Sequence, residues 1–398
     1  MSRTIGTVVR GVRAPIFRQG DDVVSIAADT VVNALAEEGI TPRDKDVVAI
    51  TESVVARCQG NYATVQQIAT DVKAKTGGKT VGVTFPILSR NRFSLLLSGI
   101  ASGAKKIVLL LSLPSDEVGN HLVSMDQLDE AGVDPYRDVL TLEQFRSHFG
   151  SVIHPFTGVD YVDYYQSLIQ EAGAQVEIIF SNRVQSILPY TDTVICCDIH
   201  TRQRSKRLLK SAGARCVLGL DDLLTASVDG SGYNPQYGLL GSNKADDGRV
   251  KLFPRDTMAV AEALGQALSQ RTGKHIEAMI YGDGAFKDPV GKIWELADPV
   301  VSPACTAGLV GKPNELKIKY LADNDFAGLN GEELRSAVED SIRHKDADLK
   351  GSMASQGTTP RQLTDLIGSL CDLTSGSGDK GTPVVFIQGY FDTYAEEK

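Results

Sequence analysis

Long apolar segments are missing from this chain of 398 residues. Its longest apolar run, Ile107 to Leu111, is far shorter than the roughly 20 residues that a transmembrane helix needs. The first residues, Met1 to Arg13, alternate arginine with small apolar residues and contain no apolar core of a signal peptide. We therefore expect a cytoplasmic protein with no signal peptide and no membrane partner.

Paired cysteine motifs are also missing. The chain has 6 cysteines, and none of them forms a C-x-x-C pair. Cys196 and Cys197 lie inside an apolar run, which is typical of buried thiols. We expect all the cysteines to be reduced and structural, as in a cytosolic protein.

The familiar phosphate-binding motifs do not occur. Gly78-Lys79-Thr80 resembles the end of a P-loop, but Lys73 stands where the first glycine belongs. The segment also leads into an expected strand, whereas a P-loop opens a helix, so we interpret it as the end of a helix before a strand. No G-x-G-x-x-G follows an expected strand, which disfavours a nicotinamide oxidoreductase.

An excess of positive charge is absent, since the formal net charge is -9. An acidic surface disfavours non-specific binding to nucleic acid and to anionic membranes. It does not exclude an anionic small molecule, because a basic pocket can lie within an acidic protein.

The length and the pattern of expected elements predict several domains in an α/β protein. Between residues 79 and 224, strands alternate with helices, as in a doubly wound parallel sheet. We expect a first domain part over residues 1–78, an inserted α/β domain over residues 79–224, and a second domain part over residues 225–398. The expected strands of the insertion are Thr80–Thr84, Lys106–Leu113, Gln175–Phe180, Thr193–Cys197 and Arg215–Leu218.

A glycine-rich loop follows the last expected helix and precedes the last expected strand. Gly376, Gly378 and Gly381 allow successive backbone N–H groups to turn inward and bind an anion, and Lys380 adds a cation. A flexible surface turn explains the same glycines equally well.

Asp283 follows an expected apolar strand and lies between two glycines. A carboxylate at such a strand end suits a hard divalent metal, which prefers oxygen ligands. The alternative is an ordinary Asp-Gly turn.

Several cations have both a plain and a functional interpretation. Arg57, beside Gly60, suits a phosphate ligand or a surface ion pair. Asn243 and Lys244 lie in a glycine-rich stretch that we do not expect to be packed in a core. Asp198 and His200 are weak candidates for metal ligands. A basic cluster follows them and is typical either of a solvated helix face or of a site for an anionic ligand; it comprises Arg202, Arg204, Lys206 and Arg207.

Five segments, taken in order, resemble the family of coenzyme F420-0 gamma-glutamyl ligases. The segments lie within residues 11–23, 44–61, 238–248, 271–291 and 362–389. Residues 79–224 have no counterpart in the short members of that family, so the chain resembles a long bacterial branch with an inserted domain.

The resemblance implies a homodimeric α/β ligase that binds GTP, or ATP in its place, with Mg2+ or Mn2+ and with K+ as a further candidate ion. It implies L-glutamate and an acidic acceptor as substrates and Asp283 as a metal ligand. From the chemistry of the reaction, we expect Arg57 and Lys244 to act as catalytic cations. The implied nucleotide-binding residues are Val12, Arg13, Ala14, Pro15, Glu52, Ser53, Arg57, Asn243, Lys244, Gly376, Ser377, Gly378, Asp379, Lys380 and Gly381.

The chain departs from the family pattern at several positions. Gly241 stands where the family has a second metal aspartate, and Gly284 stands where it has threonine. Arg57 replaces a lysine and Lys244 replaces an asparagine. We expect Asn243, Asp246 or a residue of the insertion to substitute for the missing metal ligand. The expected activity is therefore ligation through an acyl phosphate, on coenzyme F420-0, on a folate or on another acidic metabolite. A nucleotide-binding regulatory protein whose metal site has decayed is the alternative from another class.

Overall fold

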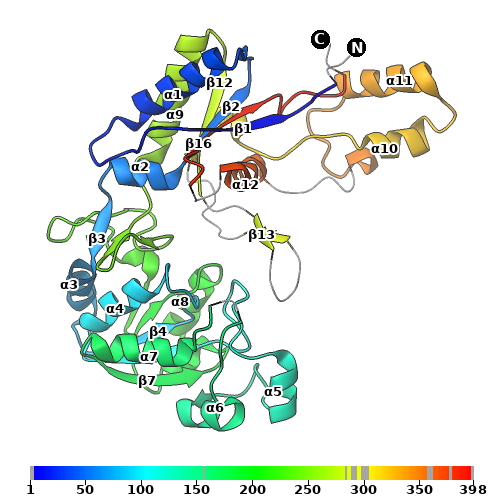
Figure 1. The fold of residues 1–398 in the computed structure, drawn as a ribbon. Helices are drawn as coiled ribbons and strands as arrows, with labels where there is room; N and C mark the ends of the chain where they lie inside the picture. The colour runs from blue at the N-terminus through cyan, green and yellow to red at the C-terminus, as the bar shows by residue number, and fades with distance from the viewer. Residues whose placement is uncertain are drawn as a thin grey trace. The chain divides into compact units, whose positions relative to one another are not determined.

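The computed structural model is a mixed α/β protein (Figure 1). It describes residues 4–155, 157–282, 285–287, 294–296, 304–355, 362–375 and 379–395. The chain forms two compact units, and each is described by itself. Unit 1 comprises residues 1–55, 256–286 and 296–398, and unit 2 comprises residues 56–255 and 287–295.

Unit 1 is built on a five-stranded sheet with the order β1-β16-β2-β12-β15. Strand β16 lies between β1 and β2 and is antiparallel to both, whereas β2 and β12 are parallel. The strands are β1 (Val8–Val12), β2 (Asp46–Thr51), β12 (Ile276–Tyr281), β15 (Ala304–Cys305) and β16 (Val384–Gln388).

Both faces of this sheet are buried, as expected for strands that are apolar along their whole length. Helices α1 (Val23–Glu37) and α9 (Thr257–Thr272) cover one face, where they pack on alternate residues such as Val48 and Ile50. Helix α12 (Leu363–Ser375) covers the other face, where it packs on Val47 and Ala49. Asp22 caps the first helix, since its carboxylate accepts hydrogen bonds from the N–H groups of Val24 and Ser25.

The remaining elements of unit 1 precede α12. They are η3 (Ala307–Leu309), α10 (Ile318–Tyr320), η4 (Leu321–Asp325), α11 (Gly331–Arg343) and η5 (Met353–Ser355). Three elements cross between the units along the chain: α2 (Glu52–Cys58), β13 (Ala285–Lys287) and β14 (Trp294–Leu296).

Unit 2 contains a six-stranded sheet with the order β6-β7-β5-β4-β8-β9. All its neighbouring strands are parallel except β6, which is antiparallel to β7. The strands are β4 (Thr80–Thr84), β5 (Lys106–Leu111), β6 (Leu140–Thr141), β7 (Gln175–Phe180), β8 (Thr193–Cys196) and β9 (Cys216–Gly219). The predicted parallel strands are therefore present with nearly the predicted bounds.

Helices pack on this sheet and on one another. One face buries Val108, Leu110 and Val194 against Leu209 of α8 (Arg202–Ser211). The other helices and short turns of the unit are α3 (Val65–Thr76), α4 (Ser94–Ser102), α5 (Met125–Ala131), α6 (Leu142–Phe149), α7 (Tyr161–Glu171), η1 (Val184–Ile187) and η2 (Leu220–Asp222). Helices α5 and α6 lie between β5 and β7 in the sequence.

A small antiparallel sheet completes unit 2. It has the order β10-β11-β3, formed by β10 (Asn243–Lys244), β11 (Arg249–Lys251) and β3 (Tyr62–Thr64). The glycine-rich stretch before β10 is more buried than we predicted: Leu239 and Leu240 are 0% and 5% exposed. A packed segment therefore leads into this sheet, which corrects the expectation of a plain loop.

The bounds of the two units differ from the predicted division at residues 78 and 224. Unit 2 contains the predicted insertion, residues 79–224, together with residues 56–78 and 225–255. Where the insertion begins and ends relative to other members of the family stays a prediction.

Candidate functional site

Four strand ends of unit 1 meet at one edge of its sheet, which we call the site edge. Val384 at the start of β16 pairs with Val12 at the end of β1 on one side and with Ile50 of β2 on the other. Tyr281 at the end of β12 pairs with Thr51 at the end of β2. The loops that follow β1, β2 and β12 therefore leave the sheet at the same edge as the loop that precedes β16.

Hydrogen bonds of the backbone and of one hydroxyl hold these loops in place. The N–H of Ala14 donates to the carbonyl oxygen of Gly381 over 3.1 Å, and that of Thr51 donates to Pro383 over 3.0 Å. The hydroxyl of Thr382 donates to the carbonyl oxygen of Ser375 over 3.1 Å, which closes the glycine loop at its base. The structure thus brings three predicted segments together: residues 12–15, residues 52–53 and residues 379–381.

The predicted metal ligand Asp283 and the loop residues Gly376, Ser377 and Gly378 lie outside the described residues. Residues that flank both segments nevertheless touch. The buried phenol of Tyr281 donates a hydrogen bond to the hydroxyl of Ser375 over 2.8 Å. The chain therefore enters both predicted segments from one point of the site edge.

The predicted residues of unit 1 differ in exposure. Glu52 is buried at the first position of α2, and Ser53 beside it is partly buried. The other predicted residues of this edge are exposed or partly exposed, apart from buried Val12: Arg13, Ala14, Pro15, Asp379, Lys380 and Gly381.

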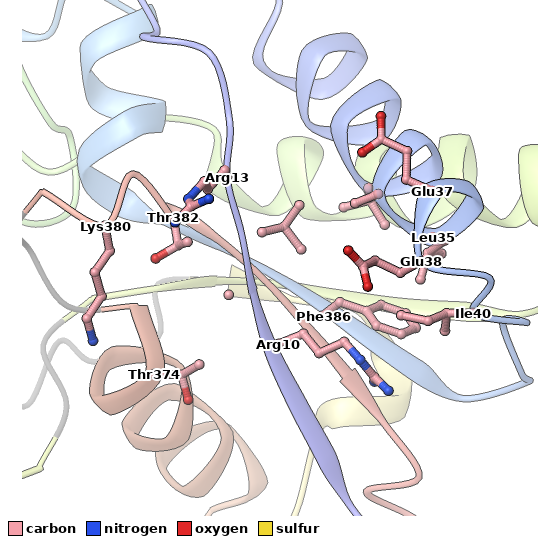
Figure 2. A pocket seen from close by; sticks show the side chains of 14 residues that line it. Arg10, Arg13, Leu35, Glu37, Glu38, Ile40, Thr374, Lys380, Thr382 and Phe386 are labelled. Atoms are coloured by element: carbon pink, nitrogen blue, oxygen red, sulfur yellow. The ribbon is translucent and has the colours of Figure 1, made fainter.

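A pocket of about 570 Å³ lies beside the site edge, between α1 and β1 (Figure 2). Arg13, Lys380 and Thr382 line it near the glycine loop, and Arg10 and Glu38 line it further along β1. Figure 2 shows the Glu38 carboxylate turned toward the space between the helix and the strand. Apolar side chains of α1 and Phe386 complete the wall. The pocket therefore offers cations, carboxylates and an apolar surface to a mixed ligand.

Arg10 is a pocket residue that the sequence analysis missed. Its Nη1 is buried and has no hydrogen-bond partner within the described part of the chain. A buried charged donor without an acceptor is costly, so this position favours an anionic group in the pocket. The sequence signal for Arg10 is the alternation of side chains along a strand, which places Arg10 on the same face of β1 as Val12.

The remaining predicted residues belong to unit 2. Arg57 is exposed at the end of α2, and Asn243 and Lys244 form β10. The ammonium group of Lys244 donates to the Asp247 carboxylate over 2.9 Å, and this hydrogen bond raises the pKa of Lys244. The side chain of Lys244 is therefore positively charged at neutral pH.

Comparison with known families adds the deciding observation. A model of the F420-0:gamma-glutamyl ligase family matches residues 11–389, nearly the whole chain. The chain belongs to the F420-0:gamma-glutamyl ligase family. A comparison with curated proteins gave no match.

Membership in this ligase family indicates an enzyme that forms amide bonds with glutamate, in the biosynthesis of coenzyme F420. The match begins at Gly11 in β1 and ends at Gly389 just after β16, so it includes the end of each strand that meets at the site edge. The predicted resemblance to this family is confirmed.

Gly241, where we predicted that the family has a second metal aspartate, has a backbone that does not fit one. Gly241 has φ +73°, and a Cβ at this position would lie 2.6 Å from the ring of Phe253. An aspartate would therefore be strained and would clash. The nearby carboxylate of Asp246 is engaged by Arg249 at 2.6 Å.

The described residues contain neither a cluster of metal ligands nor a helix that could span a membrane. No group of three or more His, Cys, Asp or Glu side chains is arranged to hold a metal ion in the parts that the structure describes. Within the same parts, every helix is too short or too polar to cross a membrane. A metal at Asp283 stays a prediction, since that residue lies outside them.

Proposed function

We propose that the protein is a GTP- or ATP-dependent gamma-glutamyl ligase that joins L-glutamate to an acidic acceptor such as coenzyme F420-0. The observation that carries the proposal is the hydrogen bond between Tyr281 and Ser375, within a chain that matches the ligase family. It supports a common site for the segment that contains Asp283 and for the glycine loop.

The proposed chemistry proceeds in two transfers. The acceptor carboxylate attacks the γ-phosphorus of the nucleotide, so that an acyl phosphate forms and the nucleoside diphosphate leaves. The α-amine of glutamate then attacks the acyl carbon, loses a proton and expels inorganic phosphate, which leaves the amide bond.

Residues of the site edge would bind and orient the reactants in this scheme. Backbone N–H groups of the glycine loop and the ammonium group of Lys380 would hold phosphate oxygens. Arg13 and the Nη1 of Arg10, which has no partner among the described residues, would hold anionic groups in the pocket. Arg57 and Lys244 are the further cations that we propose for the triphosphate.

Asp283 supplies an oxygen donor, the ligand type that Mg2+ and Mn2+ prefer, and either ion would neutralise phosphate charge there. K+ stays a further candidate ion. A homodimer and a cytoplasmic location belong to the same proposal.

The decisive experiment is a mass-spectrometric screen of the purified protein. It combines GTP or ATP, Mg2+ or Mn2+, glutamate and a panel of acidic metabolites that includes coenzyme F420-0 and folates. We expect an acceptor that gains one glutamyl group only when nucleotide and glutamate are both present. Without any glutamylated product, the proposed activity would be wrong.

The variant Asp283→Asn tests the metal ligand. We expect ligation to fall by at least about 100-fold, because a neutral amide binds a divalent cation weakly. The thermal unfolding midpoint should stay within about 2 °C of the wild type. The control is Asp325→Asn, which changes an exposed aspartate of unit 1 and should leave turnover unchanged. Full turnover by Asp283→Asn would remove this residue from the mechanism.

Gly241 favours a second candidate, a regulatory protein that binds nucleotide without ligating glutamate. Its positive φ and the nearby Phe253 ring leave no room for the second metal aspartate of the family. Glutamate-dependent hydrolysis of GTP or ATP separates the two candidates. Nucleotide binding without such hydrolysis would support the regulatory protein.

A further inference from the structure

Unit 2 has a topological switch point that the proposed ligase site does not use. From β4, the sheet continues to β5 and β7 on one side and to β8 and β9 on the other. The chain therefore reverses its direction of winding between β4 and β8. In open parallel sheets, ligands bind outside the carboxyl ends of the strands at such a point.

A carboxylate already occupies the loop after β8. Glu117, from the loop after β5, accepts hydrogen bonds from the N–H groups of Ile199 at 2.6 Å, His200 at 3.1 Å and Thr201 at 3.0 Å. The hydroxyl of Thr201 also lies 2.6 Å from this carboxylate. Three successive N–H groups that converge on one anion form an anion-binding nest.

Helix α8 strengthens the nest. The helix begins at Arg202, has no acidic residue in its first turn, and receives no side-chain cap from Thr201. The positive end of its dipole therefore favours the negative charge of the Glu117 carboxylate. The nearby cations Arg202 and Lys206 pair with Asp221 and Asp222, so they position the helix rather than bind Glu117.

Asp198 is a second acidic group beside the nest. It is 0% exposed, and its Oδ2 lies 2.8 Å from the Thr201 hydroxyl and 2.7 Å from the Ser205 hydroxyl. The Thr201 hydroxyl therefore lies within hydrogen-bond distance of both carboxyl groups. Burial, assisted by the negative charge of Glu117, raises the pKa of Asp198.

The other oxygen of Asp198 is unused. Its Oδ1 is buried and has no hydrogen-bond partner among the residues that the structure describes. Both hydroxyl contacts of Asp198 are made by Oδ2, so Oδ1 is left as a hydrogen-bond acceptor. The site thus presents a row of donors for an anion and, beside it, one buried acceptor that lacks a donor.

We propose that the loop Asp198–Thr201 and the start of α8 form a site for the hydrogen phosphate ion, with the Glu117 carboxylate as an internal competitor. Phosphate oxygens replace the Glu117 oxygens at the N–H groups of Ile199, His200 and Thr201. The P–O–H group donates to Asp198 Oδ1, which a carboxylate cannot do. This site lies wholly in unit 2 and does not depend on the proposed ligase activity.

The proposal predicts a specific selectivity. Inorganic phosphate keeps at least one proton near neutral pH, whereas sulfate has none. A phosphomonoester also loses its last proton with a pKa of about 6. Sulfate and phosphomonoesters therefore bring oxygen lone pairs to the acceptor Oδ1 and bind more weakly than inorganic phosphate.

Isothermal titration calorimetry of the full chain tests the proposal, with inorganic phosphate, sulfate and glycerol phosphate as probes at pH 7.5 and without nucleotide or glutamate. We expect Glu117→Gln to bind inorganic phosphate at least tenfold more tightly than the wild type, because the competing charge is lost. The control Glu177→Gln alters a carboxylate that pairs with Lys106 and should bind like the wild type.

Localisation uses a second pair of variants. Thr201→Val should weaken phosphate binding at least tenfold in the Glu117→Gln background, whereas Lys380→Ala in unit 1 should have no effect. Loss of binding in Lys380→Ala alone would assign the phosphate to the nucleotide site and overturn the proposal. Equal affinity for sulfate and phosphate, or no phosphate binding by folded Glu117→Gln, would overturn it as well. If Glu117→Gln does not fold, the same selectivity and Thr201→Val comparisons apply to the wild-type background.

Discussion

Single side chains fix the geometry of the site edge. Tyr281 is 2% exposed and Ser375 is 4% exposed, so their hydrogen bond is shielded from water. Burial raises the pKa of the Tyr281 phenol, which therefore stays protonated and donates at any physiological pH. The bond fixes the end of β12 to the end of α12, directly before the two segments that the ligase proposal requires.

Tyr281→Phe removes this donor and leaves the Ser375 hydroxyl without its partner. We expect the free energy of unfolding to fall by about 1 kcal/mol, the usual value of a buried hydrogen bond. Urea denaturation followed by circular dichroism measures the change. Tyr136→Phe, at a tyrosine that is 77% exposed, is the matched control and should leave stability unchanged. An unchanged Tyr281→Phe protein would show that the bond adds nothing to stability.

Asp160 shows a different use of a carboxylate. It caps α7 and forms an ion pair with Arg146 at 2.9 Å. Desolvation alone would raise its pKa, but hydrogen bonds from Arg146 and from the N–H groups of Val152 and Asp163 outweigh this effect and lower it. Because the folded pKa lies below the unfolded one, the stabilisation is present above about pH 4 and disappears as the pH falls through the folded pKa.

Asp160→Asn keeps a residue that caps helices well but removes the charge. We expect the thermal midpoint of the variant to lie below that of the wild type at neutral pH, and the difference to shrink as the solution becomes more acidic than about pH 4. Differential scanning calorimetry across this range measures it. Exposed Asp129, changed to Asn, should show no such convergence. A difference independent of pH would exclude the charge as its cause.

At the scale of elements, close helix packing in unit 2 depends on glycine. An added Cβ at Gly99 of α4 would lie 2.7 Å from the Ile68 side chain of α3. A similar Cβ at Gly103 would lie 2.7 Å from the carbonyl oxygen of Ala69. The two helices therefore approach along a face where one of them has no side chains.

Gly99→Leu should separate α3 from α4. We expect a loss of roughly 1–3 kcal/mol in the free energy of unfolding, because overpacking shifts the backbone and strains side-chain rotamers. Urea denaturation monitored by circular dichroism measures it. Gly248→Ala is the control in the same unit, since a Cβ there meets nothing within 4 Å. Equal stability of the two variants would contradict the tight contact.

At the scale of the whole molecule, each unit has its own apolar interior, and the cysteines contribute to both. All 6 cysteines are free thiols. Cys58, Cys196, Cys197 and Cys371 are buried, whereas Cys216 and Cys305 are partly exposed. Burial raises the pKa of Cys196 to about 12, so its reactive thiolate is rare at neutral pH.

Thiol labelling with a disulfide reagent tests this arrangement. We expect slow and partial labelling of the native protein, limited to Cys216 and Cys305, because burial also raises the pKa of these two thiols. In a strong denaturant, all 6 should react rapidly. Mass spectrometry after proteolysis identifies the labelled positions. Rapid labelling of native Cys196 or Cys197 would show that the core of unit 2 opens.

The sequence by itself determined the local structure and the family. The sequence pattern located the parallel strands of unit 2, and the expected helix end before Thr80 is present, with Gly77 in the left-handed conformation. Neighbours along the chain encode these features, so a short window reveals them. The order of the matching segments also predicted membership in the ligase family.

Only the tertiary structure decided which distant residues touch. The hydrogen bond between Tyr281 and Ser375 joins residues that are 94 positions apart in the sequence. The hydrogen bond from the N–H of Ile199 to Glu117, just before α8, joins residues that are 82 positions apart. Arg10 became a pocket residue because β1 lies at the sheet edge beneath α1. Such contacts follow from strand order and helix packing. Many different local sequences are compatible with the same packing, so no local sequence pattern predicts these contacts.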